Sequence, residues 1–197
     1  MSDPVTDLTA ARRLMVLNQL RPQGVTDARV LAAMGMVPRE DHLPANLRDT
    51  AYGDRPLRLD SGAPVMPPAE LGQLLTRLAP EPGDRALVMG EGGAYSAAVL
   101  GAIGLTVATS VDGDKVDGDF DLILIEGAVD HVPPTLLARL APGGRIGVAI
   151  VTDGVTRLAM GRAASNSAGS AAIGLTSFAE AQVPILPGFA RAPAFAF

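Results

Sequence analysis

RALVMGEGGAYSAAVLGA, residues 85–102, is the stretch that decides the fold. Its first five residues form a short apolar run, its centre is rich in glycine, and residues 96–102 have the composition of a helix. A strand, a glycine turn and a helix in this order open a doubly wound α/β sheet, in which parallel strands alternate with helices. The chain is therefore predicted to be an α/β protein.

The segments that follow continue this alternation. Residues 120–125 are almost entirely apolar, as expected of a strand that is covered on both faces. Residues 134–140 read as a helix that ends before Pro142, Gly143 and Gly144. The segments predicted as strands are residues 85–89, 105–111, 120–125, 145–151, 156–162 and 173–182.

The first third of the chain is predicted to be helical and rich in loops. Asp27 is a suitable N-cap for one helix, and Pro68 and Glu70 suit the first turn of another. The predicted helices are residues 10–20, 28–36 and 69–78. We expect a single domain, with residues 1–80 as this helical region, 81–152 as the parallel-sheet core, and 153–197 as C-terminal β segments and a packed apolar tail.

Composition argues against several classes of protein. The 197 residues carry a net charge of -5 and show no basic stripe, so a nucleic-acid partner is not expected. Without cysteine there can be no disulfide and no thiol nucleophile. No run is apolar and long enough to span a membrane, and the start lacks the apolar core of a signal peptide. A cytoplasmic protein is therefore expected.

Short motifs outside the glycine turn carry a more specific signal. They read Asn18-Gln19-Leu20-Arg21, Val37-Pro38-Arg39-Glu40, Ala51-Tyr52-Gly53-Asp54, Phe120-Asp121 and Leu186-Pro187-Gly188-Phe189. With these motifs the chain resembles the protein-L-isoaspartate O-methyltransferases, as a divergent and shortened bacterial member. The resemblance implies a Rossmann-like fold with N-terminal helices. It also implies transfer of a methyl group from S-adenosylmethionine to an abnormal aspartyl carboxylate.

The resemblance places the cofactor at the glycine turn, where Gly90, Gly92 and Tyr95 match the family pattern. Glycine at such a turn lets the backbone approach a ligand closely. The family's turn also has a third glycine, and an acid two residues before the first glycine. Here Ala94 and Val88 stand at those two positions, so the cofactor signal is weaker than in an intact member.

Two acids fit the same ligand. Glu91 lies inside the turn, where a carboxylate would repel the pyrophosphate of NAD or FAD. S-adenosylmethionine carries a sulfonium and an ammonium but no phosphate, so it tolerates an acid there. Asp112 lies about 22 residues after Gly90, close to the spacing of a ribose-binding acid. The expected cofactor is therefore S-adenosylmethionine, bound by Gly90, Glu91, Gly92, Tyr95 and Asp112.

The acceptor element departs from the family pattern. The resemblance implies a Thr-Ile-Ser sequence beside the acceptor carboxylate, and here Pro64, Val65 and Met66 stand there, followed by Pro67. A thioether cannot donate a hydrogen bond to a carboxylate. Losing one such bond costs about 1.5–3 kcal/mol, or about one to two decades in rate. We therefore expect impaired or absent transfer, with the acceptor-site positions at Val65, Met66 and Pro67.

Compared with the family it resembles, the chain is predicted to lack one crossover unit of the sheet. Only residues 113–119 separate the strands predicted at 105–111 and 120–125, where the resemblance implies a helix, a strand and another helix. A parallel crossover normally needs a dozen or more residues, and an extended stretch of this length reaches about 25 Å at most. We expect fewer strands than the family's seven, with an exposed edge or a dimer contact. The lost strand is either the second or the third of the family.

Polar groups after the strand at 120–125 are candidates for the rim of a site, because ligands bind beside the carboxyl ends of strands in open α/β sheets. Glu126, Asp130 and His131 lie there, and His131 is either a general base or a loop histidine. The acidic turn at residues 112–119 does not fit an EF-hand, because Val116 occupies a ligand position and no glutamate closes the loop. No metal site is expected.

Three functional hypotheses follow. The first is an active methyltransferase that acts on an isoaspartyl or a related carboxylate of proteins or peptides, with its activity impaired. The second is a catalytically dead relative that serves as a binding or dimerisation module. The third is a small-molecule binder that uses the glycine turn for an adenosine compound.

Overall fold

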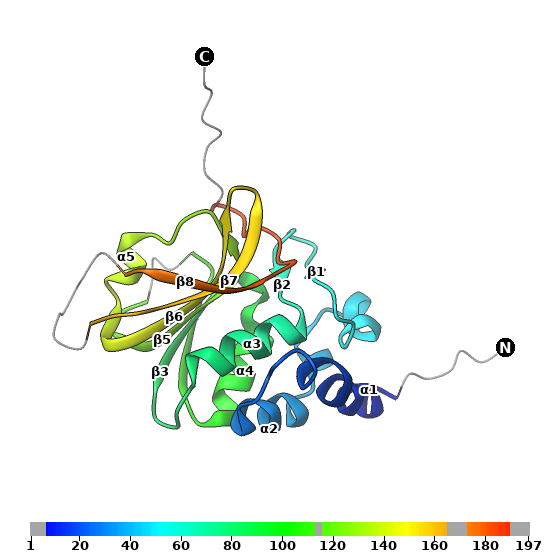
Figure 1. The fold of residues 1–197 in the computed structure, drawn as a ribbon. Coiled ribbons are helices and arrows are strands. Elements are labelled where there is room, and N and C mark those ends of the chain that lie inside the picture. Colours follow the sequence, from blue (N-terminus) through cyan, green and yellow to red (C-terminus); the bar gives the residue numbers. More distant parts are fainter. Residues whose placement is uncertain (1–6, 113–115, 165–172, 190–197) are drawn as a thin grey trace, which may run out of the picture.

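A six-stranded sheet forms the centre of the computed structural model, which describes residues 7–112, 116–164 and 173–189 (Figure 1). The strand order is β4-β3-β5-β6-β7-β8; the first four of these run parallel, and β7 and β8 continue the sheet antiparallel. The six strands are β3 Arg85–Met89, β4 Thr106–Ser110, β5 Phe120–Val129, β6 Leu140–Thr152, β7 Val155–Arg162 and β8 Leu175–Glu180. A separate antiparallel pair joins β1 Leu57–Arg58 and β2 Pro64–Val65.

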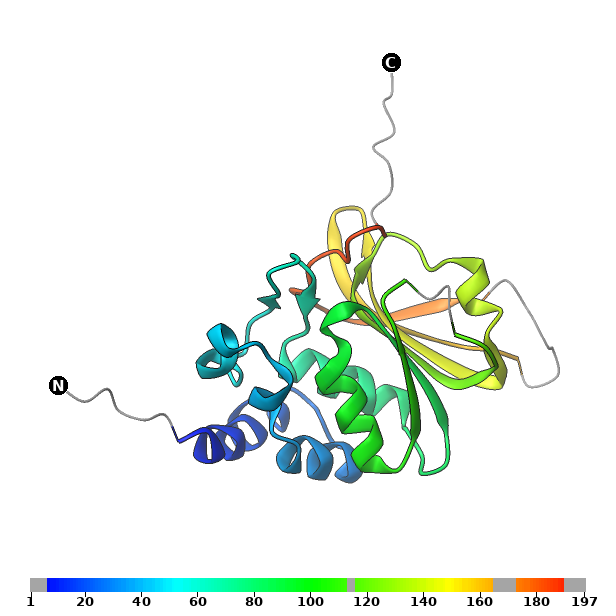
Figure 2. The ribbon, with the colours of Figure 1, turned by 180° about the vertical axis from the view of Figure 1, so that it is seen from behind.

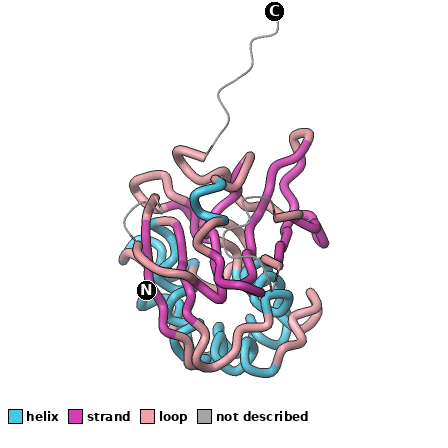
Figure 3. The backbone as a smooth tube through the Cα atoms, turned by 90° about the vertical axis from the view of Figure 1, so that its left-hand side faces the viewer, coloured by secondary structure: helices cyan, strands magenta, loops and turns pink. Residues whose placement is uncertain are grey.

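Most of the helices gather on one side of this sheet, at the lower part of the side view in Figure 3, whereas α5 Pro134–Leu137 packs on the opposite face. The α-helices are α1 Leu8–Met15, α2 Ala28–Met36, α3 Pro68–Leu78, α4 Ala94–Ile103 and α5 Pro134–Leu137. Shorter helical turns are η1 Val16–Leu20, η2 Arg39–His42, η3 Ala45–Thr50 and η4 Glu91–Gly93. The helix predicted at residues 10–20 is therefore present without a break, but its second half, Val16–Leu20, is a π-helix.

Alternation along the buried strands gives the sheet two apolar faces. Ala86 and Val88 of β3 pack into a cluster with α2, α3 and α4, whereas Leu87 and Met89 pack on the opposite face with α5. The N-terminal helices, α3 and α4 lie together on one side in both ribbon views (Figures 1 and 2). This arrangement confirms the predicted Rossmann-like α/β class.

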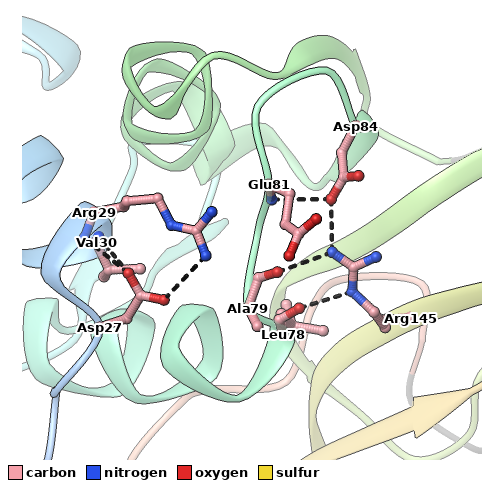
Figure 4. A network of polar contacts seen from close by, with 8 residues as sticks. All are labelled: Asp27, Arg29, Val30, Leu78, Ala79, Glu81, Asp84 and Arg145. Carbon is pink, nitrogen blue, oxygen red and sulfur yellow. Dashed lines mark hydrogen bonds and ion pairs between the residues drawn. The ribbon is translucent and has the colours of Figure 1, made fainter.

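Local capping explains where two of these helices begin and end. Asp27 accepts hydrogen bonds from the backbone N–H groups of Arg29, at 2.8 Å, and Val30, at 3.2 Å, so it caps α2 as predicted (Figure 4). At the C-terminal end of α3, Ala79 takes a left-handed conformation with φ 45°. Arg145 of β6 donates to the carbonyl oxygens of Leu78, at 2.7 Å, and Ala79, at 3.1 Å, which satisfies the end of that helix.

The helix predicted at residues 134–140 is wrong in length. Only Pro134–Leu137 is helical, and β6 already begins at Leu140, so the predicted stop at Pro142 lies inside a strand. Leu140 pairs with Phe120 across the parallel ladder, and the Phe120 N–H donates to the Arg139 carbonyl at 2.8 Å. Pairing with a strand remote in sequence overrides the local helical composition here.

The missing crossover is confirmed: in the described part of the chain the sheet has six strands, with β4 at one edge. β4 pairs directly with β3 in an unbroken parallel register, from Arg85 opposite Thr106 to Met89 opposite Ser110. It therefore lies directly beside β3, at the edge of the described sheet. Thr106 and Thr109 are exposed along this edge.

Part of the C-terminal tail packs as predicted. Leu186 is buried, and its N–H donates to the Ala128 carbonyl at 2.7 Å beyond a bulge in β5. Residues 190–197 of the tail, residues 165–172 between the last two predicted strands and residues 113–115 of the acidic turn lie outside the described residues. Among the helices that the structure describes, none is both long and apolar enough to cross a membrane.

Candidate functional site

A pocket of about 480 Å³ opens where β3 and β4 end, within the size range of small-molecule sites. Both strands present their carboxyl ends to it, which is where open α/β sheets bind ligands. The glycine turn after β3 forms one wall and the end of β4 forms the other. The lining residues are Gly90, Glu91, Gly93, Ala94, Thr109, Ser110, Val111 and Asp112.

Two glycines of the turn are required by their surroundings. Gly90 has φ 115°, a conformation that other residues rarely adopt, and its N–H donates to the Ser110 carbonyl at 2.8 Å. A Cβ at Gly93 would lie 2.5 Å from the side chain of Val88. Val88, which stands where the family has an acid, is thus packed beneath the turn, and it brings no charge to the pocket.

Among the residues that the structure describes, the charged side chains in the pocket lining are both acidic. Glu91 and Asp112 are exposed and lie on opposite walls, and no described lysine or arginine lines the pocket. The Ser110 hydroxyl lies 3.4 Å from an Asp112 carboxylate oxygen. Such a pocket suits a ligand with positive charge and hydroxyl groups better than one that carries phosphates.

Gly92 and Tyr95, the other two predicted cofactor residues, do not line the pocket. A Cβ at Gly92 would lie 2.0 Å from the Pro64 carbonyl oxygen, so this glycine allows β2 to rest directly on the turn. Tyr95 is buried, with the guanidinium carbon of Arg39 4.8 Å from its ring centre, and burial raises the pKa of its hydroxyl. The structure therefore brings Gly90, Glu91 and Asp112 together at the pocket, whereas Gly92 and Tyr95 face the interior of the protein.

The predicted acceptor positions are buried. Val65, Met66 and Pro67 all lie in the interior, and the Met66 side chain is part of the apolar core. The Met66 N–H donates to Glu126 at 2.8 Å, and the Met66 carbonyl accepts from Arg39 at 2.7 Å. Both polar groups of the Met66 backbone are therefore already paired within the protein.

Of the three predicted rim residues, Glu126 lies inside the protein, with 1% of its surface exposed. Its second carboxylate oxygen accepts from the Ser96 hydroxyl at 2.6 Å. Burial raises the pKa of Glu126, and the bonds from Ser96 and Met66 and the charge of Arg39 oppose this rise. Asp130 is half-buried and His131 is exposed, and neither lines the pocket.

Sequence reasoning missed the role of Arg39, which is fully buried. Its Nε donates to the Ala51 carbonyl at 2.8 Å, and desolvation by burial lowers its pKa. Its Nη1 and the Tyr95 hydroxyl find no hydrogen-bond partner in the described part of the chain. The motif Val37-Pro38-Arg39-Glu40 marked the position, but nothing in its composition indicated a buried cation.

Sequence comparison decides the family of the chain. Residues 11–116 match the family model described as protein-L-isoaspartate(D-aspartate) O-methyltransferase. The chain belongs to this family. It is 35% identical to a protein-L-isoaspartate O-methyltransferase of Methylorubrum extorquens, over 97% of this chain and 95% of the relative. It is 34% identical to the enzyme of that name from Methylorubrum populi, over 93% of this chain and 98% of the relative.

The fold of the isoaspartyl methyltransferase family is shared as well. A crystal structure from Plasmodium falciparum, described as a protein-L-isoaspartate O-methyltransferase in complex with S-adenosyl-L-homocysteine, superposes with a TM-score of 0.70. It covers 89% of this chain and 97% of that chain, at 17% sequence identity. At this identity the likeness establishes the architecture, and the ligand belongs to that protein.

Proposed function

We propose that this chain binds S-adenosylmethionine and methylates abnormal aspartyl carboxylates in proteins or peptides, at a reduced rate. The observation that carries the proposal is the pocket at the carboxyl ends of β3 and β4, with a glycine turn on one wall and Asp112 on the other. Family membership supplies the reaction type, and the geometry of the pocket supplies a place for the cofactor.

The residues of the pocket fit this cofactor. Gly90 and Gly93 let the turn pack closely on the protein beneath the pocket, because a Cβ would lie 3.0 Å from the Glu126 carbonyl oxygen at Gly90 and 2.5 Å from Val88 at Gly93. In this proposal Asp112 accepts hydrogen bonds from the ribose hydroxyls, and Glu91 attracts the positive charge of the cofactor. When bound, S-adenosylmethionine supplies an electrophilic methyl group.

The acceptor side supports the reduced rate. An aspartyl-type carboxylate is ionised at neutral pH, so it needs orientation and hydrogen-bond donors rather than a general base. Met66 offers no donor, because its side chain is a thioether in the core and its N–H is bonded to Glu126. Glu126 places a carboxylate at this point, which disfavours a second one nearby.

Two measurements on the full chain test the proposal. Titration with S-adenosylhomocysteine by calorimetry is expected to give micromolar binding. Asp112→Ala is expected to weaken that binding about tenfold through loss of a charged hydrogen-bond acceptor. Asp49→Ala, an exposed acid in η3 outside the pocket lining, is the matched control and should bind as the wild type does.

Transfer is measured with labelled S-adenosylmethionine and an isoaspartyl peptide, against the same peptide with normal aspartate. We expect label only on the isoaspartyl peptide, about 10–100-fold more slowly than for a relative that keeps the Thr-Ile-Ser element. A rate equal to that relative's would refute the impairment. No binding at millimolar S-adenosylhomocysteine would refute the cofactor, and would favour the dead binding or dimerisation module instead.

A further inference from the structure

Three segments of the chain meet around the side chain of Glu126. The segments are residues 64–66, the turn that leads into α4, and the carboxyl end of β5. Besides the contact between Gly92 and the Pro64 carbonyl oxygen, a Cβ at Gly90 would lie 3.2 Å from the Glu126 Cβ. At these two glycines the turn lies too close to its neighbours to admit a side chain, so a shift in one segment displaces the others.

The Glu126 carboxylate bonds to two of these segments at once. One oxygen accepts from the Met66 N–H at 2.8 Å, and the other accepts from the Ser96 hydroxyl at 2.6 Å. Ser96 is fully buried in the first turn of α4. Arg39 donates to the Met66 carbonyl at 2.7 Å from the opposite side. The Met66 backbone is thus held between a buried cation and a buried carboxylate.

We propose that Glu126 is a positioning residue that couples occupancy of the pocket to the order of residues 64–66. The inference rests on the proposed function, because an S-adenosyl compound is the ligand that orders the turn. Ala94 lines the pocket and lies two residues before Ser96. A ligand that packs against Ala94 therefore fixes the Ser96 hydroxyl. The hydroxyl holds the Glu126 carboxylate in place against the Met66 N–H.

Two kinds of substitution separate the hydrogen bonds from the charge. Ser96→Ala and Glu126→Ala remove the bond between α4 and β5. Glu126→Gln keeps an oxygen for the Met66 N–H and brings an amide that can donate to the Ser96 oxygen, while the charge is lost. Ser177→Ala, at an exposed position of β8, is the matched control.

The readout is hydrogen exchange of the Met66 amide, followed by NMR with and without S-adenosylhomocysteine. In the wild type and in Ser177→Ala we expect the ligand to slow this exchange at least about fivefold. Ser96→Ala and Glu126→Ala should lose the effect, whereas Glu126→Gln should keep it. Because coupling is reciprocal, the factor by which the ligand slows Met66 exchange equals the factor by which opening of residues 64–66 weakens ligand binding. A merely structural role for Ser96 would speed exchange with and without the ligand alike, and would leave their ratio unchanged.

Equal protection of Met66 in the wild type and in Ser96→Ala would overturn the proposal, as would binding without protection. Absence of binding would refute the proposed function. The coupling through Glu126 would then be tested in the protein without ligand. There, Ser96→Ala must speed exchange of the Met66 and Ala94 amides together, relative to Ser177→Ala. Acceleration of only one of them, or of neither, would refute coupling through Glu126.

Discussion

Replacing Gly92 with alanine places a methyl group where β2 rests on the glycine turn. The new Cβ would lie 2.0 Å from the Pro64 carbonyl oxygen and 3.1 Å from a Val65 methyl carbon. The nearer contact is to backbone, so no flexible side chain can move aside. Either the turn or β2 must shift by about 1 Å, and overpacking of this kind costs about 3 kcal/mol.

The matched control is Gly101→Ala in α4. A Cβ there meets nothing within 4 Å, and the position is helical, so alanine should stabilise the protein by about 0.5–1 kcal/mol. For a chain of this size each kcal/mol moves Tm by about 2–4 °C. We therefore expect Gly92→Ala to lower Tm by about 6–12 °C and Gly101→Ala to raise it by about 1–4 °C.

Thermal unfolding followed by circular dichroism, with urea unfolding at 25 °C as the second measure, tests this pair. Gly92→Ala should also lose S-adenosylhomocysteine binding at temperatures where it is still folded, because the turn that lines the pocket is displaced. If Gly92→Ala melts within 1 °C of the wild type (roughly the shift expected of a few tenths of a kcal/mol), the close approach of β2 to the turn is wrong.

Four further substitutions test other contacts. Arg145→Met should lower stability by about 2 kcal/mol, because it removes a 2.6 Å ion pair with Asp84 and two bonds to the end of α3. Arg157→Ala breaks an exposed ion pair with Glu180 and should lower the free energy of unfolding by less than about 0.5 kcal/mol. If urea unfolding gives similar losses for Arg157→Ala and Arg145→Met, the greater contribution of the Arg145 contacts is wrong. Ala79→Gly should raise Tm by about 1–2 °C because φ is 45° there, and a lower Tm would argue against a strained helix end. Because the pKa of Glu126 is raised in the folded protein, its protonated form contributes stability below the ordinary pKa range of glutamate, and this contribution is lost as pH rises through the raised pKa. From pH 5 to 8 the free energy of unfolding, measured with urea, should therefore fall less steeply for Glu126→Gln than for the wild type. Parallel pH slopes would exclude this contribution.

Local signals in the sequence predicted much of the fold. The apolar run of β3, the cap at Asp27 and the proline at the start of α3 each act within a few residues, and each appears where it was expected. The helix predicted at residues 134–140 failed because the pairing of Leu140 with Phe120 joins positions that are far apart in the chain. Nothing within the local window reports such a partner.

The site divides in the same way. Strand order places the turn after β3 beside the end of β4, so Gly90, Glu91 and Asp112 could be brought together from the sequence alone. The burial of Glu126 and Arg39 could not, because charged residues are seldom buried and their partners lie far along the chain. A predicted rim carboxylate therefore proved to be an interior one.

The β4 edge of the sheet shows that this fold can lack a crossover unit and keep its inner strands in register. The pairings of β3 with β4 and with β5 run without a break, although a whole crossover unit is absent between β4 and β5. A doubly wound sheet can thus be shortened at its rim while the register of its inner strands is preserved. For protein engineering, the stretch between Asp112 and Phe120 is therefore the point at which a further crossover unit could be grafted without changing the pairing of β3 with β4 and β5.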